Sequence, residues 1–323
     1  MNAIDPSTDS RVERRVRDFL HILNSAGGPP LETLAPAEAR QVLAGAQAGA
    51  ALPSAEVEQK TISQDGLEVS LHIVRPSGAY PTELRPAFLF IHGGGWILGD
   101  FPTHERFVRD LVADTGYTAI FVNYTPSPEV RYPTAIHEIH AAAKWVAAHG
   151  PEIGVDASRL AIAGNSAGGN MSAAVSLLAA HEGGPEFRAQ VLFWPVTDAS
   201  FDTGSYHEFA SGYFLSRGMM QWFWDAYTTD PAQRQEIYAS PLQATASQLR
   251  GQPPALVQVA GADVLRDEGL AYANNLDAAG VDVTLVRYES MVHDFGLLNA
   301  LSEIPAVRDS LHQAAEFLRK HLG

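Results

Sequence analysis

The chain has 323 residues, of which 46% are hydrophobic and 18% are charged. This length fits a single large α/β domain with insertions, and the apolar content excludes wholesale disorder. The formal net charge of −15 disfavours nucleic acid and anionic lipid surfaces as partners. No apolar run approaches the roughly 18 residues of a membrane span, so we predict none. Because there are 0 cysteines, the chemistry has to use Ser, His, Asp or Glu.

The first residues lack the basic start and apolar core of a secretion signal, which predicts a cytoplasmic protein. We expect a helix from Ser10, ended by Gly27 and Gly28, and a second helical stretch after Pro36. Both precede the first strand candidates. They are therefore predicted to form an N-terminal extension packed on the main body.

Strand-like and helix-like patterns alternate along the rest of the chain. The predicted strands cover residues 57–62, 67–74, 86–91, 118–124, 160–163, 190–194, 255–260 and 283–288. The predicted helices cover residues 135–149, 167–180 and 303–321. This alternation predicts the α/β class, with a mostly parallel sheet covered by helices on both faces.

One stretch, between Asp198 and Arg250, breaks the alternation because it is rich in aromatic residues and has no clear strand. Its aromatic residues include Tyr206, Tyr213, Phe214, Trp222, Phe223, Trp224 and Tyr227. Such an insertion between two core strands is either a cap over an active site or a satellite helical subdomain. The two interpretations are compatible, since a cap also needs a small core.

A nucleophile candidate follows the strand at 160–163, where the sequence Gly164-Asn165-Ser166-Ala167-Gly168 fits G-x-S-x-G. In a sharp strand-to-helix turn, Ser166 takes strained φ/ψ angles that expose its hydroxyl above the sheet. Gly164 and Gly168 remove side chains that would clash at the turn. The pentapeptide alone also fits an ordinary glycine-rich turn, but the strand before it and the helix after it favour the nucleophile.

A second motif, His92-Gly93-Gly94-Gly95-Trp96, stands at the end of the strand at 86–91. HGGG-type motifs partner the serine turn in lipases and esterases, where backbone N–H groups stabilise the oxyanion of the acyl-transfer intermediate. The alternatives are a flexible turn or a phosphate-binding loop. The phosphate loop is disfavoured by the negative net charge and because neither G-x-G-x-x-G nor G-x-x-x-x-G-K occurs.

The general base and its acid are expected after the serine, in the order Ser, Asp or Glu, His. Asp263 follows the strand at 255–260, and His293 follows the strand at 283–288. Open α/β sheets place their sites at the carboxyl ends of strands, so these two residues are the candidates. Asp267 and Glu268 are rivals for the acid, but they fall in the next helix and are interpreted as helix-capping residues.

These motifs, in this order, resemble the hormone-sensitive-lipase family of α/β-hydrolase esterases. The resemblance covers essentially the whole chain and implies one α/β-hydrolase domain over residues 1–323. It implies a cap built from residues 1–50 and 199–250. It places the oxyanion amides at Gly94, Gly95 and Ala167, with His92 supporting the loop. It also implies a carboxylesterase for short or medium acyl chains, which acts on a small-molecule ester, and it is compatible with a homodimer.

Two positions depart from the family pattern. Asn165 stands where the family usually has Asp before the serine, which removes a charge beside the nucleophile and is expected to tune activity. Residues 123–129 read NYTPSPE where the family usually has DYRLAPE. The simultaneous loss of Asp and Arg predicts a changed structural ion pair in this loop.

The leading hypothesis is ester hydrolysis through a Ser166 acyl-enzyme, with His293 as base, Asp263 as its orienting acid and no metal or organic cofactor. Amidases, lactonases and acyltransferases use the same constellation. A non-catalytic small-molecule receptor on this fold is disfavoured because all three triad residues are present. Epoxide hydrolases and dehalogenases would want Asp at the serine position.

The substrate pocket is the least specified part of the site. Trp96 follows the oxyanion glycines, Trp194 ends the strand before the insertion, and Asn165 adjoins the nucleophile, so these three are the pocket candidates. For each tryptophan, core packing is an equally good interpretation. Bulky rings at both places would narrow the site and favour small substrates.

Overall fold

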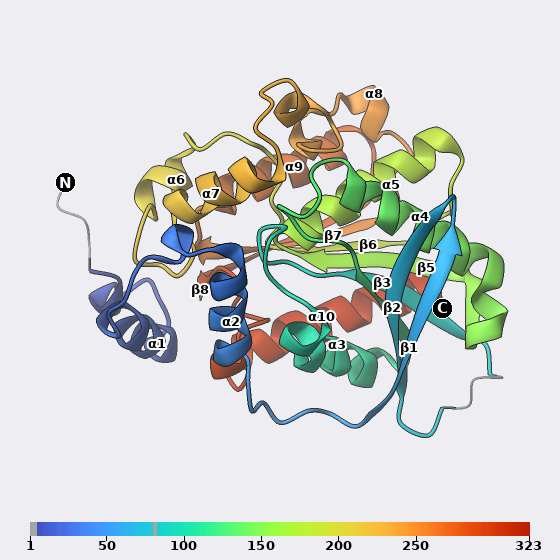
Figure 1. Cartoon of the computed structure of the whole chain (residues 1–323), viewed down its shortest axis with the longest axis horizontal. Helices are drawn as coiled ribbons and strands as arrows, with labels where there is room; N and C mark the ends of the chain where they lie inside the picture. Colours follow the sequence, from blue (N-terminus) through green and yellow to red (C-terminus); the bar gives the residue numbers. More distant parts are fainter. Residues whose placement is uncertain (1–4, 80–82) are drawn as a thin grey trace.

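The computed structural model describes residues 5–79 and 83–323. Its centre is an eight-stranded sheet with the strand order β1-β2-β4-β3-β5-β6-β7-β8 (Figure 1). The strands are β1 (Ala55–Gln64), β2 (Leu67–Pro76), β3 (Arg85–Ile91), β4 (Thr118–Asn123), β5 (Val155–Asn165), β6 (Gln190–Phe193), β7 (Ala255–Ala262) and β8 (Val283–Val292). Strand β2 runs antiparallel to both β1 and β4, and every other pairing is parallel. The predicted mostly parallel sheet is confirmed.

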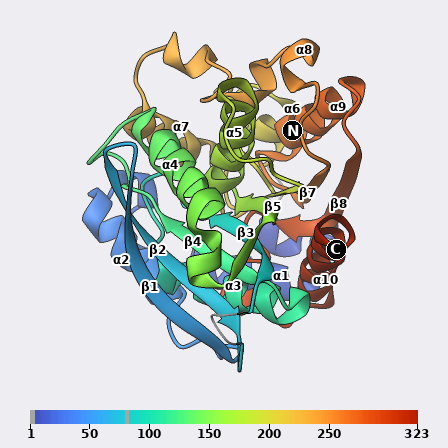
Figure 2. The same cartoon turned by 90° about the vertical axis from the view of Figure 1, so that its right-hand side faces the viewer.

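Helices cover both faces of this sheet, as the sequence predicts. The long helices are α3 (Phe101–Thr115), α4 (Thr134–His149), α5 (Ala167–Glu182), α9 (Arg266–Ala278) and α10 (Pro305–Leu322). Helices α4, α5 and α9 lie on one face, and α3 and α10 pack together on the other (Figures 1 and 2). Burial on both sides explains why β3 and β7 read as continuous apolar runs rather than alternating ones.

The N-terminal segment contains η1 (Pro6–Thr8), α1 (Arg14–Ser25), η2 (Leu31–Thr33) and α2 (Pro36–Ala46). The expectation that the first helix begins at Ser10 is wrong. The carboxylate of Glu13 accepts hydrogen bonds from the amides of Arg15 and Val16, and this capping fixes the start of α1 at Arg14. Residues 10–13 form a turn instead of a helix, in which the Asp9 carboxylate accepts hydrogen bonds from the amide and guanidinium of Arg11.

The aromatic insertion is helical and contains no strand within the described residues. Its elements are α6 (Gly204–Glu208), α7 (Arg217–Tyr227), η4 (Gln233–Gln235), η5 (Pro241–Gln243) and α8 (Ala246–Leu249). The remaining short helices of the fold are η3 (Gly150–Ile153) and η6 (Asn299–Leu301). The insertion meets the N-terminal segment where the Asn24 amide donates to the carbonyl of Gly212 at 3.0 Å.

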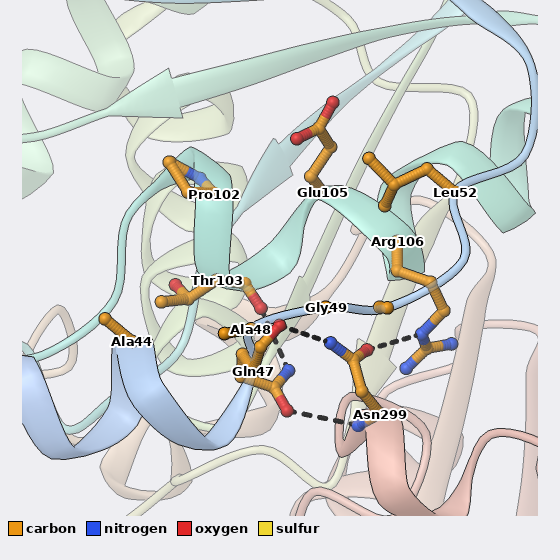
Figure 3. Close-up of a pocket in the computed structure, with 11 residues that line it drawn as sticks. Ala44, Gln47, Ala48, Gly49, Leu52, Pro102, Thr103, Glu105, Arg106 and Asn299 are labelled. Atoms are coloured by element: carbon orange, nitrogen blue, oxygen red, sulfur yellow. Dashed lines mark hydrogen bonds between the residues drawn. The ribbon is translucent and has the colours of Figure 1, made fainter.

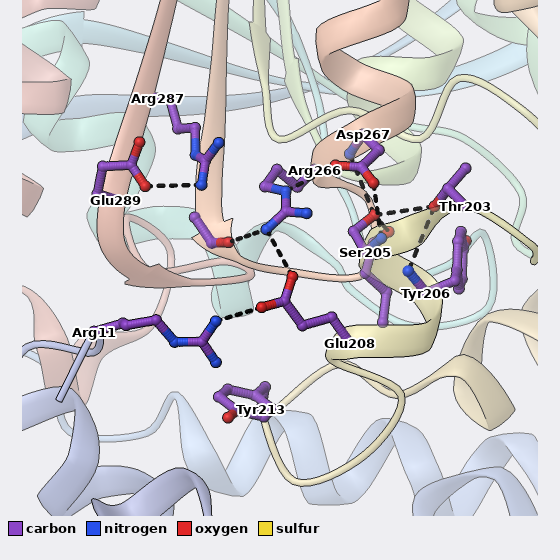
Figure 4. A network of polar contacts seen from close by, with 12 residues as sticks. Arg11, Thr203, Ser205, Tyr206, Glu208, Tyr213, Arg266, Asp267, Arg287 and Glu289 are labelled. Atoms are coloured by element: carbon purple, nitrogen blue, oxygen red, sulfur yellow. Dashed lines mark hydrogen bonds and ion pairs between the residues drawn. The ribbon is translucent and has the colours of Figure 1, made fainter. Parts of the chain in front are cut away.

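Charged side chains reinforce this contact. Glu208 of α6 lies between Arg11 of the N-terminal segment and Arg266 at the start of α9, and pairs with both (Figure 4). Tyr213 donates a hydrogen bond to Asp9 at 2.8 Å. Two segments nearly 200 residues apart in the chain are thereby joined on one side of the molecule.

No helix within residues 5–79 and 83–323 combines the length and the apolar character needed to cross a membrane. Among the described helices, α10 reaches 18 residues, and its last turn is charged. The last helix, α10, shows this: Leu311, Ala314 and Leu318 are buried, whereas Arg319, Lys320 and His321 occupy its final turn.

Candidate active site

The nucleophile candidate sits in a sharp turn between β5, which ends at Asn165, and α5, which begins at Ala167. Ser166 has φ 54° and ψ −121°, the strained conformation predicted from the motif. The turn also needs glycine at position 168, because a Cβ there would lie 2.0 Å from the carbonyl oxygen of Ile91. The backbone of β3 and the start of α5 therefore approach so closely that any side chain would displace the serine.

The structure brings the three predicted catalytic residues into one hydrogen-bonded chain. His293 Nε2 lies 2.9 Å from Ser166 Oγ, and His293 Nδ1 lies 2.7 Å from Asp263 Oδ2. The second carboxylate oxygen of Asp263 accepts from the Leu265 amide at 3.0 Å, which fixes its orientation. All three residues are buried, with Ser166 at 4% exposure. This geometry suits proton transfer from a serine hydroxyl to a histidine held by a carboxylate.

Two carboxylates act on the pKa of His293. Burial lowers the pKa of this imidazole, but the negative charges of Asp263 and Asp294 outweigh burial, so the net pKa lies above the usual 6.5. Asp294 Oδ2 is 3.7 Å from His293 Nε2, on the side of the ring that faces the serine. The site therefore favours the imidazolium that forms when His293 takes the serine proton.

The predicted oxyanion loop follows β3. Gly94 and Gly95 have φ values of 101° and 60°, which an L side chain adopts only with strain. Within the part of the chain that the structure describes, their two amides donate no hydrogen bond to other protein groups. His92 is fully buried, its Nδ1 lies 2.9 Å from the Gly93 carbonyl oxygen, and burial lowers its pKa to about 4. A neutral His92 therefore supports the loop through its contact with the Gly93 carbonyl.

Asp294 is a site residue that the sequence reasoning missed. Its Oδ1 accepts from the Asn165 amide at 2.9 Å and from the Trp194 indole at 2.6 Å. Asn165 in turn accepts from the amide of Gly93 at 3.0 Å. This network links the serine turn, the oxyanion loop and the loop after β8 that carries His293, which we call the histidine loop. The position of Asp294, directly after the predicted base, was a signal that could have pointed to it.

The two tryptophan candidates lie in different surroundings, and both are 1% exposed. Trp194 packs against Phe295, with ring centroids 4.5 Å apart, and touches the site through its bond to Asp294. Trp96 stacks on Tyr227 at 4.3 Å, within the aromatic insertion. The Trp96 ring thus joins the oxyanion loop to α7.

A further residue, Phe223 of α7, lies directly over the oxyanion loop. A Cβ placed on Gly95 would come within 2.2 Å of the Phe223 ring, so only glycine allows this contact. Sequence reasoning placed Phe223 in the insertion but had no signal for its partner. The close approach depends on how the insertion folds back over the sheet edge.

Comparison with known proteins identifies the fold family. Residues 88–297 match the family model described as alpha/beta hydrolase fold. This chain belongs to that family. It is 56% identical to a thermostable esterase from Pseudomonas putida ECU1011, with a TM-score of 0.95 over 97% of this chain and 98% of that one.

Curated relatives agree with this assignment. An ethyl acetate hydrolase from Pseudomonas putida is 34% identical over 261 residues, 80% of this chain and 81% of the relative. The carboxylesterase NlhH of Mycobacterium tuberculosis is 34% identical over 274 residues, 84% of each chain. The predicted membership in the carboxylesterase family of α/β hydrolases is confirmed.

The two departures from the family pattern have structural counterparts. An Asp at position 165 would put a second carboxylate against Asp294, whereas Asn165 offers an amide to it. In the 123–129 loop, Glu129 pairs with Arg40 of α2 at 2.7 Å, and Thr125 donates twice to Glu138. Glu129 is a residue that this loop shares with the family pattern, so its pair with Arg40 is separate from the predicted change. At the changed position 125, the threonine makes hydrogen bonds to Glu138 and no ion pair.

The rival acids Asp267 and Glu268 lie in the first turn of α9, as expected. The prediction that they cap this helix is wrong, because their carboxylates bind other segments. Asp267 accepts from the Ser205 amide at 2.7 Å, and Glu268 accepts from the Thr197 amide at 2.7 Å. Both side chains extend away from α9 towards the segment that follows β6. Burial raises the pKa of Glu268. These residues anchor the insertion beside Asp263 and do not touch His293.

Proposed function

We propose that this carboxylesterase cleaves small carboxylic esters through a covalent acyl-enzyme on Ser166. The observation that carries the proposal is the continuous chain from Asp263 through His293 to Ser166, with contacts of 2.7 and 2.9 Å. A buried serine in a strained turn, next to a base that is itself held by a carboxylate, is the arrangement that acyl transfer requires.

In the proposed reaction, Ser166 Oγ attacks the ester carbonyl carbon while His293 Nε2 takes its proton. The oxyanion of the tetrahedral intermediate accepts hydrogen bonds from the amides of Gly94, Gly95 and Ala167. His293 then returns the proton to the leaving alcohol. A water molecule, activated by the same nitrogen, hydrolyses the acyl-enzyme, and Asp263 stabilises the imidazolium in both halves.

Short substrates are supported by two observations. Phe223 covers the face of Gly95, and the triad is nearly excluded from solvent, so a bulky group has little room beside the serine. The relative from Pseudomonas putida is named for ethyl acetate, a short ester. We further propose that residues 1–50 and 199–250 form the cap that creates this enclosure.

Turnover of p-nitrophenyl acetate and butyrate by wild type and Ser166→Ala tests the assignment. We expect the variant to lose at least about 1,000-fold in kcat, because no other group replaces the nucleophile. A variant that keeps most of its activity would overturn the role of Ser166. An unfolding curve that matches wild type shows that the loss is chemical.

A substrate panel that varies acyl length and alcohol bulk independently defines the ester class. Anilides and lactones in the same panel, and an alcohol as competing acceptor, distinguish amidase, lactonase and acyltransferase activity. We expect esters with short acyl groups to have the highest kcat/KM. Cytoplasmic location and a homodimer stay predictions, for which cell fractionation and light scattering are the measurements.

A further inference from the structure

Helix α2 of the N-terminal segment is held by unusually few apolar contacts. Among its residues only Ala39 is fully buried, and Leu43 is partly buried against the core. Val42, on the same helix, is 52% exposed. Apolar burial alone therefore gives α2 a weak attachment to the rest of the fold. Its position depends on polar side chains in its second turn and at its C-terminal end.

In the second turn of α2, Arg40 contacts the end of the oxyanion loop and the loop at residues 123–129. Its Nε donates to the carbonyl oxygen of Ile97 at 2.8 Å, and one terminal nitrogen donates to the carbonyl oxygen of Ser127 at 3.0 Å. Glu129 accepts from both terminal nitrogens, which orients the guanidinium. The Ile97 amide donates back to the carbonyl of Gly94. Arg40 thus holds the turn that carries the predicted oxyanion amides.

At the C-terminal end of α2, Gln47 contacts the loop that follows the catalytic histidine. Its Nε2 donates to the carbonyl oxygens of Leu297 and Thr103, both at 2.9 Å. Its Oε1 accepts from the Asn299 amide at 3.1 Å, and its backbone carbonyl accepts from the Asn299 side chain at 2.8 Å (Figure 3). Every polar atom of the Gln47 side chain is therefore bonded, and the side chain is 5% exposed.

Arg106 of α3 also binds this loop through hydrogen bonds. One of its terminal nitrogens donates to the carbonyls of Gly296 and Leu297 at 2.6 and 2.7 Å, and its Nε donates to Asn299 at 2.8 Å. Asp110 balances its charge. A cavity of about 290 Å³ borders Gln47, Arg106 and Asn299 on one side. Gln47 itself is almost fully buried beside this pocket, and its hydrogen bonds fix the orientation of its side chain.

We infer that Arg40 and Gln47 are positioning residues, through which α2 braces the oxyanion loop against the histidine loop. The two residues are seven positions apart, which places them on the same helix face about 10 Å from each other. One rigid helix thus spans two loops that must keep their relative geometry during acyl transfer. This inference rests on the proposed roles of the oxyanion loop and His293.

The near-isosteric variant Gln47→Met tests the brace because it removes the hydrogen bonds without leaving a cavity. We expect kcat for p-nitrophenyl acetate to fall about 10-fold or more, with KM within about twofold, since misalignment of His293 affects the transition state and not substrate binding. Affinity for a trifluoromethyl ketone, a mimic of the tetrahedral intermediate, is expected to fall in parallel with kcat/KM.

Matched controls come from exposed side chains of the same chemistry. Gln41 is an exposed glutamine of α2, and Arg14 is an exposed arginine of α1. Gln41→Met and Arg14→Met are expected to keep kcat within about twofold of wild type. Arg40→Met tests the other end of the brace independently, and we expect a severalfold loss of kcat, again with KM nearly unchanged.

Three outcomes distinguish a failure of the brace from a failure of the proposed function. A folded Gln47→Met with wild-type kcat overturns the brace at the histidine loop, and a folded Arg40→Met with wild-type kcat overturns it at the oxyanion loop. If Gln47→Met does not fold, Asn299→Ser decides the point from the opposite side, because it removes the side-chain amide that donates to the Gln47 carbonyl and the oxygen that accepts from Arg106. If Ser166→Ala remains active, the proposed function fails instead, whatever the brace variants do.

Discussion

The loops at the carboxyl edge of the sheet and the segments that lie over them are built differently. Outside glycine, six described residues have positive φ, and four of them lie in the loops after β3, β5, β6 and β8: Trp96, Ser166, Trp194 and Asp294. These loops are buried and held by short hydrogen bonds. The overlying segments instead expose apolar side chains, such as Ile22 at 70%, and meet through surface ion pairs.

The contrast shows where the fold stores backbone strain. Each non-glycine residue at positive φ costs about 1–3 kcal/mol, so four of them persist only where the surroundings fix them. The catalytic loops are therefore expected to tolerate almost no change. The N-terminal segment and the insertion are expected to tolerate substitution, except where they contact those loops.

Gly168→Ala is expected to have the largest effect. The new Cβ would lie 2.0 Å from the carbonyl oxygen of Ile91, so the serine turn has to move. We predict a loss of more than about 100-fold in kcat and about 3 kcal/mol or more of stability, measured by ester turnover and urea unfolding. Gly45→Ala in α2, where a Cβ meets open space, is the matched control and is expected to be neutral or stabilising. Equal behaviour of the two variants would contradict the account.

Trp194→Ala is expected to affect stability and specificity together. The variant leaves a large cavity next to Phe295 and removes a donor from Asp294, so we predict a loss of about 3–5 kcal/mol in the free energy of unfolding. If Trp194 narrows the pocket, relative kcat/KM for bulky esters rises in the substrate panel. An unchanged profile would place its role in packing alone.

Asp294→Asn is expected to shift the pH dependence while keeping both hydrogen bonds to its Oδ1. The Asp294 charge raises the pKa of His293, and only the neutral imidazole acts as base, so activity falls as the pH drops through this pKa. Without the charge, the acid limb of kcat/KM should move to lower pH. Profiles of both proteins from pH 4 to 9 measure this. An unmoved limb, or a flat wild-type limb down to pH 4, argues against the assignment.

Glu208→Gln is expected to have the smallest effect, because it removes two partly exposed ion pairs, one between the overlying segments and one between the insertion and α9. We predict a change in unfolding free energy below about 1 kcal/mol that shrinks further at high salt, with kcat within about twofold. Thermal melts at low and high ionic strength give the answer. A large loss of activity would mean that the segments are as strictly positioned as the loops below them.

The sequence predicted those parts of the site that follow from local patterns. The turn at Ser166 was predicted because an apolar strand, a glycine-flanked serine and a small-residue helix follow one another directly. Asp263 and His293 were predicted because each follows a predicted strand, and parallel strands carry their carboxyl ends to one edge of the sheet. The helix Phe101–Thr115 was not predicted, although Asp100 at its N-cap and Gly116 after its end are recognisable signals.

Contacts between segments that are distant in the chain could not be predicted from local sequence patterns. The bond from Trp194 to Asp294 joins residues 100 positions apart, and the contact of Phe223 with Gly95 depends on the path of the insertion. The order of strands in the sheet, with β3 between β4 and β5, is also set by tertiary packing. Gln47 gave no signal, because a buried glutamine at a helix end resembles any solvent-facing one in sequence.

The most direct test of the central claim is to locate the covalent intermediate. Wild-type protein treated with diethyl p-nitrophenyl phosphate, digested and analysed by mass spectrometry is predicted to carry one phosphoryl adduct, on the peptide that contains Ser166. The adduct should form far more slowly in His293→Ala, because the base that activates the serine is missing. An adduct on another residue, or an equal rate in the variant, would contradict the account.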